Sequence, residues 1–243
     1  RLAASDPCFQ SHGNSPSGRE RCRRLLWTAL PLGGTAALLS LTSNLPKYVI
    51  SEQFDDHMLG IYGSLAVTIQ AGNLIFRAIE VPSLPRLAAH LSQGDSKGFW
   101  GLLGKLIAIF ATIGIAGSVV SLIVGGQILQ LLFNAEYAMM GGVLALVVLG
   151  TACAQIAGII ESSLIAARIT TIQLPMHCLT AGLCFVLSLL LIPTMAIPGA
   201  VLAVTICRFP FMAIGVWLLR QKLRDSEASQ VALAPPQSIR RAA

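Results

Sequence analysis

Residues 99–124 read FWGLLGKLIAIFATIGIAGSVVSLIV, and Lys105 is the one charged side chain among them. An apolar run of about 20 residues is long enough, as a helix, to cross the hydrocarbon core of a bilayer. A lone strand in lipid would leave its backbone groups unpaired, whereas a helix satisfies them internally. The stretch therefore predicts a transmembrane helix.

Five further runs of the same kind lie on either side of this one. We predict spans over residues 25–45, 58–79, 99–124, 139–167, 174–192 and 199–219. Pro46 is expected to close the first span, and Gly125-Gly126 to end the third, with 127–133 as a short interfacial helix. Loops are expected at 47–57, 81–98 and 168–173, and a tight turn at 193–198.

The fold class that follows is an all-α membrane protein, in which about six transmembrane helices form one lobe. We divide the chain into a polar tail or linker at 1–24, a six-helix lobe at 25–220 and a cytoplasmic tail at 221–243. Because the chain opens on Arg1 and a polar stretch, we expect it to be the C-terminal part of a longer protein.

The composition argues against a soluble protein. Apolar residues make up 54% of the chain and charged residues 12%, about half the charged share of a typical soluble domain. The net charge is +6, but the basic residues form no stripe with interleaved aromatics, so a nucleic-acid partner is not expected.

The basic residues predict the orientation in the membrane. Lys47 is the one basic residue of the loops on one side, which also carry acidic residues. The tails and the opposite loops hold fourteen, counting Lys105 just inside its span: Arg1, Arg19, Arg21, Arg23, Arg24, Arg86, Lys97, Lys105, Arg168, Arg220, Lys222, Arg224, Arg240 and Arg241. By the positive-inside rule both tails are cytoplasmic, with the bilayer itself as a partner.

Besides Lys105, four charged residues fall within or at the end of predicted spans, where each costs about 2.5–3.5 kcal/mol on insertion scales. Arg208 is a candidate contact for a pyrophosphate, which a guanidinium can bind with two parallel hydrogen bonds; the alternative is an ion pair with a carboxylate in the bundle. Glu161 is a candidate proton or sodium site, or a partner for an arginine. Arg77 and Glu80 share a helix face, as a local ion pair or as a gate for substrate access.

Polar residues suggest where a cavity opens. Asn44 and Lys47 flank Pro46, which frees a backbone carbonyl, although Lys47 could equally snorkel to the interface. Gln70 and Asn73 share a helix face, and line a cavity or join neighbouring helices by hydrogen bonds. His177 is more typical of a packed or interfacial histidine than of a ligand.

Small residues within the predicted spans have a structural interpretation. The small residues Gly114, Ala116, Gly117, Gly141 and Gly142 indicate close helix packing.

The six cysteines predict neither a disulfide framework nor a metal site. Cys8 and Cys22 precede the first span, and the others lie in apolar runs as small hydrophobes. Because no Ser/His/Asp group, paired acid or phosphate-cradling glycine loop is visible, we expect neither an enzyme nor a cofactor.

Several short motifs occur in a familiar order. They are 30–33 (LPLG), 40–48 (SLTSNLPKY), 83–88 (SLPRLA), 94–99 (GDSKGF), 133–138 (FNAEYA), 167–168 (AR) with 173–175 (QLP), and 197–200 (IPGA). In this order, over residues 25–222, the chain resembles the C-terminal lobe of oligosaccharide flippases of the Wzx type. These belong to the multidrug/oligosaccharidyl-lipid/polysaccharide exporter superfamily.

The resemblance implies a function and a partner. Family members have about twelve or more spans in two lobes related as parallel repeats, so an N-terminal lobe of the same transporter would be missing here. They move undecaprenyl-pyrophosphate-linked oligosaccharide across the bacterial inner membrane for O-antigen, exopolysaccharide or capsule. The alternatives are another exporter of the superfamily, for drugs or lipid II, and a non-transporting membrane scaffold.

Overall fold

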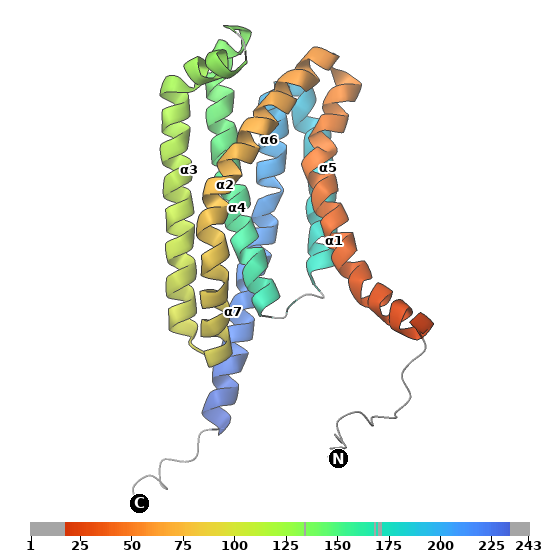
Figure 1. Ribbon diagram of the computed structural model, residues 1–243, viewed down its shortest axis with the longest axis vertical. Coiled ribbons are helices and arrows are strands. Elements are labelled where there is room, and N and C mark those ends of the chain that lie inside the picture. The colour runs from red at the N-terminus through yellow and green to blue at the C-terminus, as the bar shows by residue number, and fades with distance from the viewer. Residues whose placement is uncertain (1–17, 134, 168, 170–171, 234–243) are drawn as a thin grey trace, which may run out of the picture.

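The computed structural model describes residues 18–133, 135–167, 169 and 172–233, and these form a bundle of long helices (Figure 1). Its elements are α1 (Gly18–Gln53), α2 (Asp56–Gln93), α3 (Ser96–Leu132), the 3-10 helix η2 (Ala135–Met140), α4 (Gly141–Ala166), α5 (Gln173–Met195), α6 (Ile197–Ile206) and α7 (Arg208–Leu233). The predicted class, an all-α membrane protein, is confirmed.

Five of these helical stretches are long and apolar enough to cross a membrane: α2, α3, α4, α5, and α6 joined to α7 as far as Arg224. They bury little of their apolar surface inside the bundle; Leu122 and Ile123 on α3, for example, are 63% and 74% exposed. Apolar side chains exposed over the length of such helices suit contact with lipid rather than water. α1 packs along α5 and completes the bundle.

Several predicted helix ends are wrong, because the chain continues as a helix through prolines and through Gly125-Gly126. α1 continues through Pro46 to Gln53, and the Thr42 carbonyl that Pro46 leaves without its helical donor accepts a hydrogen bond from Cys184 Sγ at 3.7 Å. α2 likewise continues through Pro82 and Pro85, so that the predicted loop at 81–98 shrinks to a turn at Gly94 and Asp95.

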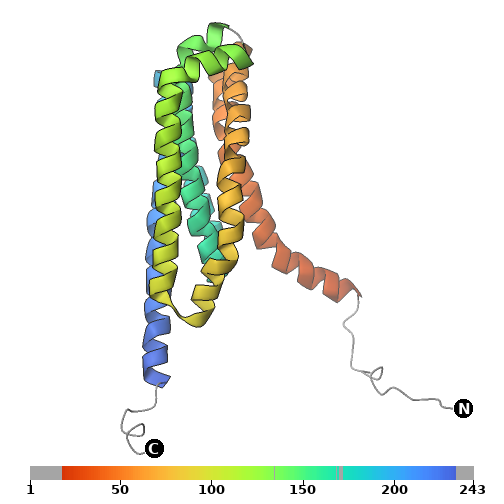
Figure 2. The same ribbon diagram turned by 60° about the vertical axis from the view of Figure 1, so that its left-hand side comes forward.

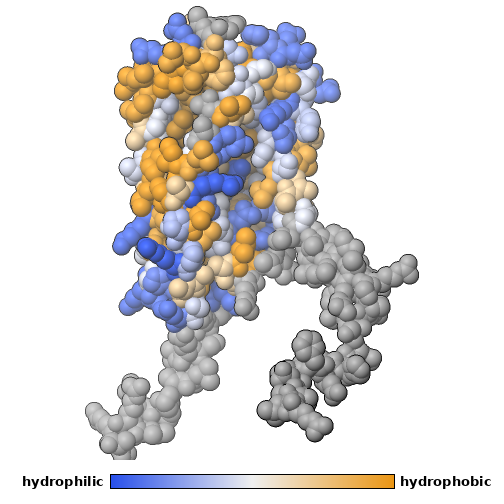
Figure 3. Space-filling model, in the orientation of Figure 1, coloured by the Kyte–Doolittle hydropathy of each residue, from blue (hydrophilic) through white to orange (hydrophobic). Residues whose placement is uncertain are grey.

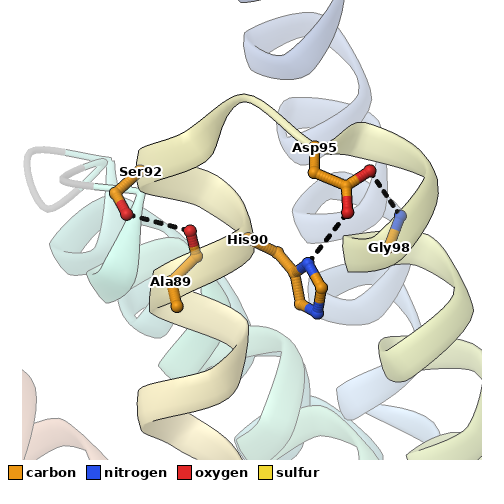
Figure 4. Close-up of polar contacts among 5 residues, drawn as sticks. All are labelled: Ala89, His90, Ser92, Asp95 and Gly98. Carbon is orange, nitrogen blue, oxygen red and sulfur yellow. Dashed lines mark hydrogen bonds and ion pairs between the residues drawn. The ribbon is translucent and has the colours of Figure 1, made fainter.

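This turn between α2 and α3 has clear local causes (Figure 4). Gly94 adopts φ 68°, the left-handed conformation that glycine enters without strain. Asp95 caps α3 by accepting a hydrogen bond from the Gly98 amide at 2.9 Å, and its other oxygen lies 3.0 Å from His90 Nδ1. These contacts, with the charge of Lys97, lower the pKa of Asp95.

Glycine pairs allow helices to approach closely. Gly125 and Gly126 do not end α3; a Cβ on Gly141 would lie 2.9 Å from the backbone nitrogen of Gly126. Residues 127–132 are therefore the last turns of α3, and η2 supplies the short helix after it.

Close packing is confirmed for three of the five small residues. A Cβ on Gly114 or Gly117 would lie 3.0 Å or less from α4, and Gly141 closes the contact with α3. Ala116 is exposed, and a Cβ on Gly142 would have no neighbour within 4 Å, so those two positions do not pack closely.

The predicted last span is interrupted next to its charged residue, Arg208. Ala196 alone separates α5 from α6, and α6 ends at Ile206 before α7 begins at Arg208. Pro210 has no amide hydrogen to offer the Ile206 carbonyl, and its ring crowds that position, which accounts for the interruption. Arg208 thus opens a helix instead of lying within one, as the sequence had suggested.

Apolar clusters of buried side chains hold the bundle together, and two of them are large. One joins α2, α3, α4 and α7 and includes Phe76, Phe110, Ile160 and Leu219. The other joins helices α1 to α6 and includes Ile50, Leu65 and Ile197. In the turned view α1 leans away from the other helices toward its N-terminus (Figure 2).

Candidate functional site

A cavity of about 740 Å³ opens between α1, α2, α4, α6 and the first residue of α7. Hydrophilic side chains gather at mid-height on this face, between apolar regions above and below (Figure 3). In a bundle whose remaining surface is largely apolar, such a concentration marks a polar site within the membrane.

All eight residues proposed from the sequence line this one cavity. They come from four elements: Asn44 and Lys47 from α1, Gln70, Asn73, Arg77 and Glu80 from α2, Glu161 from α4 and Arg208 from α7. The structure thus brings together positions that are up to 164 residues apart in sequence (208 − 44). Their individual roles remain predictions.

Arg208 faces the cavity without a protein partner. Its Nε is buried and makes no hydrogen bond to any described residue. Among the described residues no ion pair joins it to Glu161, so the alternative of pairing with that carboxylate is not observed. A buried cationic donor left unpaired is costly, and a ligand anion or water in the cavity would satisfy it.

Lys47 turns into the cavity rather than toward an interface. Its Nζ donates a hydrogen bond to Asn44 Oδ1 at 3.0 Å, and Asn44 Nδ2 in turn donates to the Ser40 carbonyl at 2.8 Å. The ammonium group has further donors for a ligand, because one of its three is used here.

A hydrogen bond between side chains joins α2 to α4 at the cavity. Gln155 Nε2 donates to Asn73 Oδ1 at 2.7 Å, so Asn73 both lines the cavity and joins two helices. Gln70, one turn away, is exposed in the same cavity. Gln155 was missed by the sequence analysis, although a glutamine in the middle of an apolar run was a visible signal.

Of the two alternatives for Arg77 and Glu80, the local ion pair is not observed, since no salt bridge joins them among the described residues. Glu80 Oε1 instead accepts a hydrogen bond from Ser162 on α4 at 3.2 Å, and Arg77 is exposed to the cavity. The arginine is therefore available to a ligand.

Glu161 has a partner that the sequence did not suggest. Its Oε1 lies 3.0 Å from Nε2 of His177 on α5, and the side chains are 21% and 5% exposed, respectively. The imidazole also packs against Phe211, with ring centroids 5.1 Å apart. Glu161 thus lines the cavity, and His177 lies on the neighbouring helix in contact with its carboxylate.

The charges of the cavity favour an anion by a narrow margin. Lys47, Arg77 and Arg208 contribute +3 and Glu80 and Glu161 contribute −2, which leaves +1 before any proton is shared with His177. Both carboxylates already have a hydrogen-bond partner, Glu80 in Ser162 and Glu161 in His177. The charged side chains of the cavity that remain available to a ligand are therefore mostly basic.

Fold and site together define a helical membrane protein with a polar, cation-bearing cavity among its helices. In sequence, the chain is similar to the capsular polysaccharide biosynthesis protein CapF of Staphylococcus aureus, with 27% identity over 180 residues, 74% of this chain. The chain spans less than half of CapF, 46% of its length. No protein-family model and no solved structure matches the chain.

Proposed function

We propose that this chain serves polysaccharide biosynthesis as part of a flippase, which moves lipid-linked oligosaccharide across a bacterial inner membrane. The observation that carries the proposal is the convergence of Lys47, Arg77 and Arg208 on one intramembrane cavity. Similarity to a capsular polysaccharide biosynthesis protein favours a saccharide over a drug as the cargo.

The chemistry of the cavity suits such a substrate. A pyrophosphate would be held by the arginines, whose planar N–H groups match phosphate oxygens, and by Lys47 as a point charge. Asn44, Gln70 and Asn73 offer amide groups to sugar hydroxyls. Arg77 and Glu80, toward the cytoplasmic end of α2, would act where the substrate enters.

The pair of Glu161 and His177 is the proposed coupling site. A proton arriving at this pair would neutralise the carboxylate or charge the imidazole, and either change would alter the field at the cavity. The proposal favours a proton over sodium, because a single carboxylate and an imidazole offer few oxygen ligands to a hard cation.

A second lobe is part of the proposal. The matched region is less than half of CapF, and a cavity bounded by one bundle would need a facing lobe to enclose a saccharide. We therefore expect this chain, reconstituted alone in vesicles, not to flip a fluorescent lipid-linked sugar. Rapid flipping would refute the need for a second lobe while leaving the substrate assignment open to the cell assay.

The deciding experiment is deletion of the gene in its host, followed by extraction of lipid-linked saccharides. We expect surface polysaccharide to be lost and undecaprenyl-pyrophosphate oligosaccharide to accumulate on the cytoplasmic leaflet. Normal polysaccharide with increased drug sensitivity would identify a drug exporter. Loss of polysaccharide without accumulation of the lipid-linked precursor would indicate a scaffold for the biosynthetic enzymes.

A further inference from the structure

A second, separate hollow of about 700 Å³ lies between the start of α3 and the lower part of α7. It is lined by Ser96, Lys97, Trp100, Arg220, Leu223 and Arg224. Figure 2 shows these two helix segments side by side, and Phe99 and Leu219 belong to the apolar cluster that joins them. The hollow shares no residue with the cavity.

Three cations face this hollow without an acidic partner. Among the described residues no salt bridge involves Lys97, Arg220 or Arg224, and all three side chains are exposed. Asp95 lies near Lys97, but its oxygens are held by the Gly98 amide and by His90 (Figure 4). The local positive charge is thus left for an external anion.

The floor of the hollow is arranged to hold such an anion. The Arg220 guanidinium lies over the Trp100 ring, with Cζ 5.7 Å from the ring centroid, a cation–π contact that leaves the N–H groups at its edge free. The Ser96 hydroxyl oxygen is buried and makes no hydrogen bond to a described residue. Leu223, only 4% exposed, makes the base apolar.

The surroundings select a lipid over a free anion. Trp217, one turn before Arg220, is 57% exposed, and an exposed tryptophan beside basic residues is typical of the level of lipid headgroups. Basic pockets between transmembrane helices on the cytoplasmic side bind anionic headgroups, and the positive-inside distribution places this end of α3 and α7 on that side.

We propose that this hollow, lined by Lys97, Trp100, Arg220 and Arg224, binds the phosphodiester headgroup of an anionic phospholipid such as phosphatidylglycerol. Arg220 and Arg224 bind the phosphate, the Ser96 hydroxyl donates to it, and the acyl chains lie against the apolar outer surface of α3 and α7. The site holds α3 to α7 from the lipid side, and it does not depend on the transported substrate.

The test uses tryptophan quenching by bromine-labelled lipids in the reconstituted chain, with Trp27 and Trp217 changed to Phe so that Trp100 alone reports. We expect brominated phosphatidylglycerol to quench Trp100 more strongly than brominated phosphatidylcholine at equal membrane content. Each cation near the surface contributes a roughly fivefold preference, so Arg220→Gln with Arg224→Gln should reduce the preference about 25-fold. Lys97→Gln, which leaves the Trp100–Arg220 contact in place, should reduce it about fivefold.

Arg86→Gln is the matched control, because Arg86 is exposed near the same end of the bundle but does not line the hollow. It should leave the preference unchanged. Equal quenching by both lipids, or an unaltered preference in both the double variant and Lys97→Gln, would overturn the proposal. Loss of the preference in millimolar inorganic phosphate would assign the hollow to a free phosphate instead.

Discussion

Removal of the Arg208 charge is the most direct perturbation of the proposed substrate cavity. Arg208 contributes one of three cations to a lining of net charge +1 (+3 − 2), so Arg208→Gln brings that net charge to zero. It also removes the buried Nε that lacks a protein partner. Because that group makes no hydrogen bond within the described chain, its loss should harm ligand binding more than folding.

The expected magnitude follows from the kind of contact. A hydrogen bond to a charged group contributes about 1.5–3 kcal/mol, and every 1.4 kcal/mol is about tenfold in affinity. Arg208→Gln should therefore weaken binding of an undecaprenyl-pyrophosphate substrate about 10- to 150-fold. Arg208→Lys should retain part of the affinity, as a point charge without the planar fork.

The assay is the rate of surface polysaccharide appearance in the deletion strain, complemented with each variant of the transporter at matched membrane levels. Arg86→Gln, outside the cavity, is the control and should export normally. Since Glu161 contacts His177 at 3.0 Å and not Arg208, Glu161→Gln should not rescue Arg208→Gln. Full export by Arg208→Gln alone, or its rescue by the second change, would refute a binding role.

Three further predictions concern packing, orientation and pH. Gly199→Ala should destabilise the bundle by about 1–3 kcal/mol or more, because the new Cβ would lie 2.3 Å from the Leu191 carbonyl oxygen. Gly182→Ala is the control and should not destabilise it, because no atom lies within 4 Å of the new Cβ. Melting in detergent measures both variants, and equal melting temperatures would refute the packing argument. Cysteines introduced at Asp56, the first residue of α2, and at Ala196, between α5 and α6, should react with an impermeant maleimide on intact cells. These two junctions lie at the end of the bundle away from the start of α1 and the end of α7 (Figure 1). Cys22, and Cys8 outside the described residues, should not react, and the reverse pattern would invert the orientation. The pKa of Asp95 is lowered in the folded chain, so its contribution to stability is present above the unfolded pKa of about 3.9 and is lost as the pH falls below it. The difference in melting temperature between wild type and Asp95→Asn should therefore shrink with falling pH. A constant difference would contradict this.

The all-α membrane class could be predicted, because long apolar runs with few charges are typical of helices that cross a membrane. The ends of helices could not, because they depend on partners far along the chain. Pro46 looks like a terminator in sequence, but Cys184 supplies a donor to the carbonyl that Pro46 leaves open. Gly125-Gly126 looks like a break until Gly141 is seen packed against it.

Part of the candidate site could be predicted, because charged residues are rare inside membrane spans and therefore stand out in the sequence. That rule identified Arg208, Glu161, Arg77 and Glu80, and the structure places all four on one cavity. It could not identify their partners. Both pairings considered from the sequence, Arg77 with Glu80 and Arg208 with Glu161, are absent among the described residues, because Ser162 and His177 on neighbouring helices bond the two carboxylates.

These partners explain how the bundle retains an excess of unpaired cations. Two carboxylates that could have neutralised Arg77 and Arg208 are instead held by a serine and a histidine. Each free cation within the membrane costs about 2.5–3.5 kcal/mol on insertion scales, and rearrangement of nearby side chains could have avoided part of that cost. Two of the three cations also lie near a proline: Lys47 follows Pro46, and Arg208 opens α7 two residues before Pro210. A bundle optimised only for stability would have paired or removed these groups, so their concentration at one cavity points to an anionic ligand that offsets the cost when it binds.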